Sequence, residues 1–337
     1  DNIRYIEAFA GGQFGIKCDI TAEAQAAAAA LKLRRPVRYT MSYADSLMTT
    51  PKRHPADMMV KMGADANGKI TAYDIDYILE NGAHVSLGTV VMDRFVDMSS
   101  SAYDLPNVKL EGKLVYTNDT WGGAFRGAGP PQANFAVETM VDMMADKLKI
   151  DQWEFRMKNL LRPGSTIASG QKVDSWEIIG CMERIKPLYE KACKEAKEKS
   201  TPELRRGVGL GGASFGIGSP NDSSNVAVEL NPDNSVTVFA GVADPGEGND
   251  AMLSQIAAHC LGMPLKKIRL VTRDSELAPD SGISASSRQT YMSGGALVNV
   301  CKMFKEAMNE ANAKTYADLV KAGKPTKYMG KKVLEDV

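Results

Sequence analysis

The sequence predicts an α+β fold of mixed sheets with flanking helices, and three observations indicate this class. Strand-like and helix-like segments are interspersed along the 337 residues, several neighbouring strands form hairpins, and no internal repeat or low-complexity tract is present. A doubly wound parallel sheet would instead show a regular alternation of strands and helices. The length is sufficient for about two domains of roughly 150 residues each.

The first elements are a strand, a glycine turn and a helix. Residues 2–9 alternate in hydropathy like a strand, glycines at 11–15 interrupt the pattern, and the alanine-rich segment 21–33 favours a helix. Residues 56–81 predict a long hairpin, because Asn67-Gly68 is a preferred turn between two alternating runs.

The following elements complete the first half of the chain. Residues 108–116 predict a strand and residues 117–131 a loop. Apolar side chains recur at helical spacing between 132 and 149, which predicts a helix with one buried face. The increasingly charged segment 175–199 predicts a surface helix.

The polar segment 201–206 contains a proline and predicts the boundary between a first domain, residues 1–200, and a second, residues 201–337. The second domain is expected to begin with an alternating glycine strand at 207–212. Further expected elements are a hairpin at 226–230 and 235–240, a helix at 250–261, a strand at 267–272 and a long helix at 291–314.

Composition excludes several classes of protein. Lys+Arg and Asp+Glu both count 41, so the net charge of zero disfavours a nucleic-acid or membrane-surface protein. No apolar run approaches the ~20 residues that span a bilayer. The five cysteines are scattered without a CxxC pair, and the three histidines form no local metal motif. We therefore expect no disulfide framework, no metal site built from this chain's own side chains, and a reducing, cytoplasmic compartment.

Familiar nucleotide and metal motifs are absent. The glycines at 11–15 do not form GxGxxG, and residues 207–212 lead into more strand-like sequence, not into a helix. The acidic loop Asp244–Asp250 lacks the spacing of a calcium-binding hand.

Four loops rich in glycine and small residues remain, at 11–15, 122–129, 246–248 and 281–290. Without a Cβ, glycine lets main-chain N–H groups approach a ligand closely and form concavities that bind anions. Any one of these loops could be only a tight turn. Together they favour a large, charged cofactor that is held by main chain.

A set of motifs, taken in their order along the chain, resembles the motif pattern of a known protein family. The motifs are Ala10-Gly-Gly-Gln-Phe-Gly-Ile-Lys17, Lys52-Arg-His-Pro55, Thr117-Asn118, Gly123-Ala-Phe-Arg-Gly-Ala-Gly-Pro-Pro-Gln132, Asn159-Leu-Leu-Arg-Pro-Gly164, Gly246-Glu-Gly248, Ser287-Arg-Gln-Thr290 and Lys324-Pro-Thr-Lys-Tyr-Met-Gly330. The chain resembles the molybdopterin-binding portion of the xanthine oxidase family of molybdo-hydroxylases, in particular the bacterial molybdenum aldehyde oxidoreductases. The resemblance covers essentially the whole chain.

The resemblance implies a cofactor, a reaction and partners. The cofactor is molybdopterin, in the cytosine dinucleotide form, whose dithiolene holds molybdenum without a protein ligand. A glutamate activates a metal-bound hydroxide, water-derived oxygen is inserted at an aldehyde carbon, hydride passes to a sulfido ligand, and electrons leave through two [2Fe-2S] clusters. Expected partners are the remainder of the molybdopterin domain, a [2Fe-2S] subunit or domain and an FAD subunit, in an oligomer without nucleic acid or membrane insertion. The catalytic glutamate and the iron–sulfur cysteines are expected outside these residues.

The same resemblance implies roles for individual residues. Arg94 and Phe14 are expected at the reacting centre: Arg94 would stabilise developing negative charge, and Phe14 would line the site. From the residues alone, a surface ion pair of Arg94 with Asp93 or Asp97 stays open. Cofactor contacts are implied for Gly12, Phe14, Gly15, Arg126, Gly127, Gly246, Glu247, Gly248, Ser286, Ser287, Arg288 and Gln289, with the Arg288 guanidinium paired to a pyrophosphate.

The expected substrate pocket contains Arg94 and three departures from the purine-oxidising pattern. Cys18 replaces a substrate-binding glutamate. Ala128 and Ser219 replace aromatic residues, which implies a wider or less aromatic pocket. Aldehyde oxidation is therefore the first hypothesis. Hydroxylation of an N-heterocycle of the purine or nicotinate type is the second, and a cofactor-binding scaffold without turnover is the third. An Arg94 that points inward and has polar partners would favour the heterocycle, whereas an apolar channel would favour aldehydes.

Overall fold

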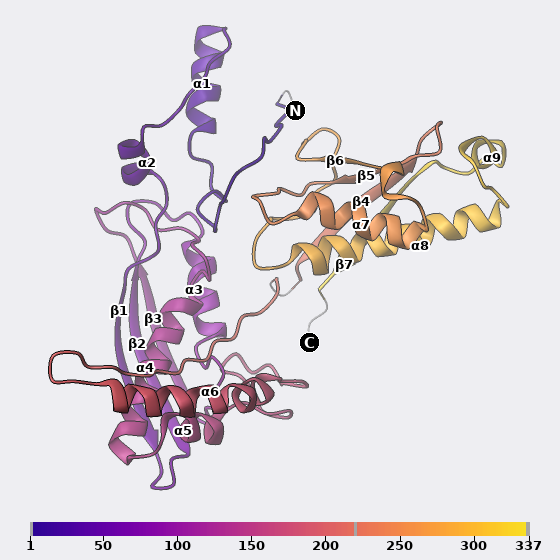
Figure 1. Cartoon of the computed structure of the whole chain (residues 1–337). Coiled ribbons are helices and arrows are strands. Elements are labelled where there is room, and N and C mark those ends of the chain that lie inside the picture. The colour runs from indigo at the N-terminus through magenta and orange to yellow at the C-terminus, as the bar shows by residue number, and fades with distance from the viewer. Residues whose placement is uncertain (1–2, 219–220, 335–337) are drawn as a thin grey trace. The chain divides into compact units, whose positions relative to one another are not determined.

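The computed structural model describes residues 3–218 and 221–334, which form two compact units (Figure 1). The β1–β3 unit comprises residues 19–215, and the β4–β7 unit comprises residues 216–336 together with 1–18. The compact units therefore divide the chain near residue 215 and not at 200. The two domains predicted from the sequence, residues 1–200 and 201–337, stay a prediction.

The sheet of the β1–β3 unit contains the predicted hairpin. Strands β1 (Ala56–Ala64) and β2 (Ile70–Glu80) pair antiparallel, with Ala56 opposite Leu79, and β3 (Val108–Val115) pairs parallel to β2. Gly68 in the turn has a φ of +82°, a conformation that glycine adopts without strain. The hairpin and the third strand confirm the prediction.

Two helices cover one side of this sheet (Figure 1). Helix α4 (Pro130–Leu148) buries Val137 and Val141 as the periodicity predicts, and it begins with two prolines, which suit the first helical turn. Helix α3 (Gly88–Asp97) was not predicted from its short apolar run, although it buries Val91 and Phe95 against the same core.

The remaining helices of this unit are α1 (Glu23–Leu33), α2 (Tyr43–Thr49), α5 (Gln152–Asn159) and α6 (Ile178–Lys199). Helices α1 and α6 confirm the prediction, and α6 is largely exposed as its charge pattern indicates. Helix α1 buries no residue, so its high alanine content is its main source of helical stability.

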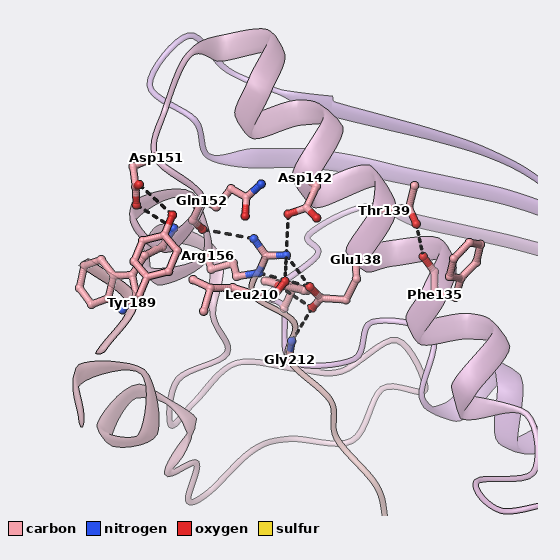
Figure 2. A network of polar contacts seen from close by, with 12 residues as sticks. Phe135, Glu138, Thr139, Asp142, Asp151, Gln152, Arg156, Tyr189, Leu210 and Gly212 are labelled. Atoms are coloured by element: carbon pink, nitrogen blue, oxygen red, sulfur yellow. Dashed lines mark hydrogen bonds and ion pairs between the residues drawn. The ribbon is translucent and has the colours of Figure 1, made fainter. Parts of the chain in front are cut away.

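A buried arginine links α4, α5 and the segment at 210–212 (Figure 2). The Arg156 side chain is 1% exposed, and its Nη2 donates to Glu138 Oε2 at 2.7 Å, Asp142 Oδ1 at 2.7 Å and the Leu210 carbonyl at 2.8 Å. Glu138 Oε1 also accepts from the Gly212 N–H at 3.1 Å. The predicted glycine strand at 207–212 is wrong: these residues join no sheet, and the Leu210 carbonyl and the Gly212 N–H bond to the ion cluster instead.

The second sheet has the strand order β6-β5-β4-β7. Strands β4 (Ser223–Leu230) and β5 (Val236–Ala240) form the predicted antiparallel hairpin, and β6 (Ile268–Thr272) runs parallel to β5 as its other neighbour. Strand β7 (Lys327–Val333) pairs antiparallel with β4 and was not predicted as a strand.

Helices α7 (Asn249–Leu261) and α8 (Gly294–Glu310) lie on one face of this sheet (Figure 1). Residues 289–293 form a π-helical turn before α8. The predicted long helix to residue 314 ends earlier, because the chain leaves the helix after Glu310 and starts α9 (Tyr316–Lys321) with a capping box at Thr315.

The N-terminal segment does not form the predicted strand. Ile6 makes one isolated bridge to Asp274, and the Glu7 N–H donates to the Arg273 carbonyl at 2.9 Å. Ile3, Ile6 and Phe9 remain exposed, so alternating hydropathy here does not correspond to one buried face. Among the described residues, no helix is long and apolar enough to cross a membrane.

We expect the ion cluster around Arg156 to contribute strongly to the free energy of unfolding. Replacing Arg156 by Met leaves the mostly buried Glu138 carboxylate without its cation, so we expect unfolding free energy to fall by about 3–5 kcal/mol. Urea denaturation followed by circular dichroism measures this change.

Lys199→Met is the matched control, since it breaks an exposed ion pair with Glu195 on α6 and is expected to change stability little. Equal losses for the two variants would contradict the importance of the buried cluster.

Candidate functional site

The predicted site residues are distributed over the two compact units. Arg94, Arg126, Gly127 and Ala128 belong to the β1–β3 unit. The β4–β7 unit contains the predicted residues of loops 11–15, 246–248 and 286–289 together with Cys18. Ser219 lies outside the described residues.

Within the β4–β7 unit, three of the four glycine loops are joined by hydrogen bonds. The Gly12 N–H donates to the Pro245 carbonyl at 2.8 Å, and Gln13 Nε2 donates to the Ser284 carbonyl at 2.8 Å. Segments separated by more than 200 residues in sequence therefore form one loop cluster.

The 11–15 loop has an unusual backbone. Gly12 and Gly15 have φ values of +62° and +101°, and Phe14, which is 57% exposed, has a φ of +49°. Gln13 Oε1 accepts from the Gly15 N–H at 3.1 Å and from Cys18 Sγ at 3.3 Å. Gln13 thus holds both ends of the loop, and Cys18 is a partner of the loop and not an isolated thiol.

The acidic loop is organised by the carboxylate of Asp244, which is 7% exposed. Its Oδ1 accepts from the N–H groups of Gly246 and Gly248, both at 3.0 Å, and its Oδ2 accepts from the Asp250 N–H at 3.2 Å. Burial by itself raises the pKa of Asp244, but these N–H donors and the charge of Arg273 outweigh it and lower that pKa. The loop is thereby fixed around a charged carboxylate.

Glu247 is exposed at the tip of this loop. Its Oε1 accepts from Asn249 Nδ2 at 2.6 Å, and the same amide nitrogen donates to the Ala243 carbonyl at 2.8 Å. The Glu247 carboxylate is therefore bonded inside its own loop.

Arg288 is placed differently from the prediction. The residue is 1% exposed and its guanidinium donates to both carboxylate oxygens of Asp222, at 2.6 and 2.8 Å. It also donates to the carbonyls of Ser281, Ile283 and Ser223. This geometry does not favour the expected pairing with a pyrophosphate, because the donors are used within the chain.

The main chain next to Arg288 has an unusual conformation. Ser286 and Ser287 have φ values of +52° and +54°, and Gln289 Nε2 donates to Ser284 Oγ at 3.0 Å. Both serines thus lie in the left-handed region, and the Arg288 N–H that follows them donates to the Ala285 carbonyl at 3.1 Å.

In the β1–β3 unit, the loop at 122–129 ends in a tight turn. The Ala128 N–H donates to the Phe125 carbonyl at 2.7 Å, and Gly127 has a φ of +98°. Gly129, with a φ of +105°, approaches helix α3 so closely that a Cβ there would lie 2.2 Å from the Val91 carbonyl oxygen. Glycine at 129 is thus required by both conformation and space.

Arg94 lies on this same helix α3 and is 6% exposed. Its guanidinium carbon is 5.5 Å from the centre of the Phe215 ring, within the range of a cation–π contact. Burial raises the pKa of Asp97, and the charge of Arg94 opposes that rise. Arg94 is therefore a buried cation in contact with an aromatic ring.

Asp244 and Gln13 are the residues of the site that the sequence reasoning did not single out for these contacts. An acid two residues before a Gly-x-Gly turn is a local signal for Asp244. No local signal indicates the contact of Gln13 with Ser284, because it joins distant segments. No group of His, Cys, Asp and Glu side chains in the described ranges is arranged to hold a metal ion.

Two family models match the chain. Both are described as molybdopterin cofactor-binding domains, the first over residues 1–160 and the second over residues 183–331. Together they cover most of both compact units.

Curated relatives have similar sequences. The aldehyde oxidoreductase of Megalodesulfovibrio gigas is 35% identical over 326 residues, which cover 95% of this chain and 36% of the relative. The xanthine dehydrogenase molybdenum-binding subunit of Escherichia coli O157:H7 is 31% identical over 90% of this chain and 41% of the relative. The chain thus spans well under half the length of these relatives.

Solved structures have the same fold. The aldehyde oxidoreductase of Desulfovibrio gigas superposes with a TM-score of 0.93 at 34% identity, over 98% of this chain and 37% of that one. The enzyme of Desulfovibrio desulfuricans gives a TM-score of 0.94 at 33% identity, over 99% and 38%.

The predicted α+β class and the resemblance are both confirmed by these matches. The chain belongs to the molybdo-hydroxylase family and constitutes a molybdopterin cofactor-binding part of the kind found in aldehyde oxidoreductases and xanthine dehydrogenases.

Proposed function

We propose that this chain is the molybdenum-cofactor-binding part of an enzyme that inserts water-derived oxygen at the carbon of an aldehyde. The observation that carries the proposal is the cluster of three main-chain loops in the β4–β7 unit, in a chain 35% identical to an aldehyde oxidoreductase. When bound, the molybdenum cofactor supplies Lewis-acid and two-electron redox chemistry.

The loops fit a large ligand that is held by main chain. A Cβ placed on Gly246 or Gly248 would meet no other heavy atom within 4 Å, so space is open beside these residues. Both have positive φ values, +106° and +88°, which glycine adopts without strain. We assign cofactor contacts to the main chain of this loop, of Gly12 to Gly15 and of Ser286 to Gln289, and in the β1–β3 unit to Arg126 and Gly127.

Asp244 keeps one of these loops in a single conformation. Three N–H groups converge on its carboxylate, so the carbonyl groups of the loop are directed away from it. The loop is organised before any ligand binds, which reduces the entropy that binding would otherwise lose.

By the family resemblance, substrate contacts are proposed for Arg94 and Ala128 of the β1–β3 unit and, separately, for Cys18 and Ser219. Arg94 would stabilise negative charge that develops on the substrate, and Phe14 would line the reacting centre. The exposed aromatic ring of Phe14 and the small residues at the other positions favour an aldehyde of some size.

The second candidate is hydroxylation of an N-heterocycle of the purine or nicotinate type. The observation in its favour is Arg94, a buried cation that could hold a ring nitrogen or oxygen. A third, a cofactor-binding scaffold without turnover, would require the loops to be retained in a chain that binds no molybdenum.

The complete enzyme is proposed to include further chains or domains. These would supply the rest of the molybdopterin domain with its catalytic glutamate, two [2Fe-2S] clusters and FAD, in a cytoplasmic oligomer. The relatives include a molybdenum-binding subunit by name, which supports this organisation. The cytosine dinucleotide form of the pterin is part of the same proposal.

Molybdenum analysis tests the proposed cofactor. The intact protein with its partner chains, purified without strong chelators, is expected to contain about one molybdenum atom and one pterin per chain. Elemental mass spectrometry and the fluorescence of the oxidised pterin measure these contents. A folded, complete assembly that contains no molybdenum would contradict the hydroxylase and favour the scaffold.

The Asp244→Ala variant tests whether the Asp244 carboxylate fixes the loop at 246–248 for pterin binding. Removing the carboxylate leaves three N–H groups without their acceptor, so we expect hydrogen exchange at 246–250 to accelerate and the protein to lose pterin several-fold faster. Asp233→Ala, in the turn between β4 and β5, is the control and is expected to retain pterin like the wild type.

The pH dependence of this effect has a defined sign. Because the folded pKa of Asp244 is lowered, its contribution is complete above an unfolded value of about 3.9 and is lost as pH falls through the folded pKa. Protection of the loop in the wild type should therefore be constant from about pH 5 to 8 and decline only in stronger acid. A decline near neutral pH would contradict this assignment.

Arg94→Met distinguishes the two substrate classes. If the substrate is an aldehyde, Arg94→Met should lower kcat/KM on the aldehyde by about 100-fold, whereas in a heterocycle hydroxylase the variant should lower kcat/KM on the N-heterocycle by a similar factor. Steady-state assays with one aldehyde and one N-heterocycle, corrected for molybdenum content, measure the difference. Arg94→Lys, which retains the charge, should restore part of any heterocycle activity.

A further inference from the structure

The Lys52-Arg-His-Pro55 motif, to which the proposed function gives no role, lies along the loop at 121–126. The Lys52 N–H donates to the Trp121 carbonyl at 3.1 Å, and the Gly123 N–H donates to the Lys52 carbonyl at 2.9 Å. The buried His54 ring is so close that a Cβ on Gly122 would lie 2.6 Å from it. The motif therefore fixes the main chain at the start of this loop.

At the end of the loop, the orientation of one peptide, between Arg126 and Gly127, still has to be fixed. Ala128 N–H bonds to the Phe125 carbonyl and Gly127 has a φ of +98°, which together define a type II turn. A type I turn closes with the same hydrogen bond and differs mainly by a rotation of the central peptide. The orientation of the Arg126–Gly127 peptide is therefore not determined by the closing hydrogen bond.

Arg53 determines this orientation. Its Nη2 donates to the Arg126 carbonyl at 2.8 Å, and its guanidinium carbon lies 4.6 Å from the centre of the Phe125 ring. A hydrogen bond from a charged donor is stronger than one between neutral groups. Burial lowers the pKa of Arg53, but a guanidinium stays charged in proteins.

A carbonyl held in this way also directs an N–H group. In a planar trans peptide the C=O and N–H bonds point in opposite directions, so the Gly127 N–H points away from Arg53. Within the part of the chain that the structure describes, no acceptor receives this N–H, and Gly127 is partly buried. The Gly127 N–H is therefore available to an acceptor from outside the described chain.

We propose that Arg53 is a positioning residue that holds the Arg126–Gly127 peptide so that the Gly127 N–H donates to an acceptor oxygen of the bound molybdopterin. The inference rests on the proposed function for its ligand. The positioning of the peptide by Arg53 rests on the geometry alone.

The test uses the intact protein with its partner chains and the variants Arg53→Met, Arg53→Lys, Gly127→Ala and Arg53→Met with Gly127→Ala. Arg205→Met is the matched control, because Arg205 is an exposed arginine of the same unit. Pterin fluorescence and molybdenum content are followed during dialysis, and the thermal unfolding midpoint is recorded for each variant.

We expect Arg53→Met to lose pterin about tenfold faster than the wild type, with Arg53→Lys in between and Arg205→Met unchanged. Because Arg53 acts through the Gly127 peptide, Arg53→Met should add little to the loss in Gly127→Ala. Independent, multiplying losses in the double variant would overturn the proposal, as would pterin retention in Arg53→Met equal to that of the wild type.

A crystal structure of cofactor-free Arg53→Met gives a second readout, which holds even if Gly127→Ala does not fold. A rotated or mixed 126–127 peptide supports the positioning role, and an unchanged peptide overturns it. If the wild-type assembly binds no pterin, the proposed function fails, whereas this crystallographic comparison still decides whether Arg53 sets the peptide.

Discussion

The β1–β3 unit depends on the burial of one positive charge. Arg156 is almost completely buried, and its donors reach two carboxylates of α4, a carbonyl of α5 and a carbonyl of the following extended segment. A buried charge is tolerated only when its hydrogen bonds are satisfied, so these elements have to meet at one point. The same requirement explains why the glycine-rich residues 207–212 lie along α4 and do not extend a sheet.

In the β4–β7 unit, Arg288 is likewise a buried cation whose hydrogen bonds are satisfied within the chain. Its guanidinium joins Asp222 at the start of β4 to the carbonyls of the loop that precedes α8. The side chain that could have bound an anionic ligand instead supports the loop from inside. In the proposed function, main-chain groups make the ligand contacts, and hydrogen bonds from or to Arg288, Asp244 and, in the other unit, Arg53 hold the main chain of these loops.

A large cofactor held by main chain has a physical advantage in such a fold. Main-chain N–H groups carry no side-chain rotamer entropy, so a loop fixed by a buried carboxylate or guanidinium binds without further ordering. The glycines provide the positive φ values, and the charged residues behind them provide the rigidity. In the proposed function, glycine loops would contact the cofactor and charged side chains would hold those loops. The described residues contain no cluster of metal-ligating side chains.

Local patterns in the sequence were sufficient for the α+β class, both hairpins, α1, α4 and α7, because hydropathy period and turn chemistry act over neighbouring residues. The ordered glycine motifs were likewise sufficient for the family. The short helices α3 and α5, strand β7 and the unpaired segments at 3–9 and 207–212 were decided by contacts with residues far away in sequence. Only the tertiary structure could place Arg288 in the interior and bring Gln13 to Ser284, because the partners of a long polar side chain are set by which distant backbone groups need a donor.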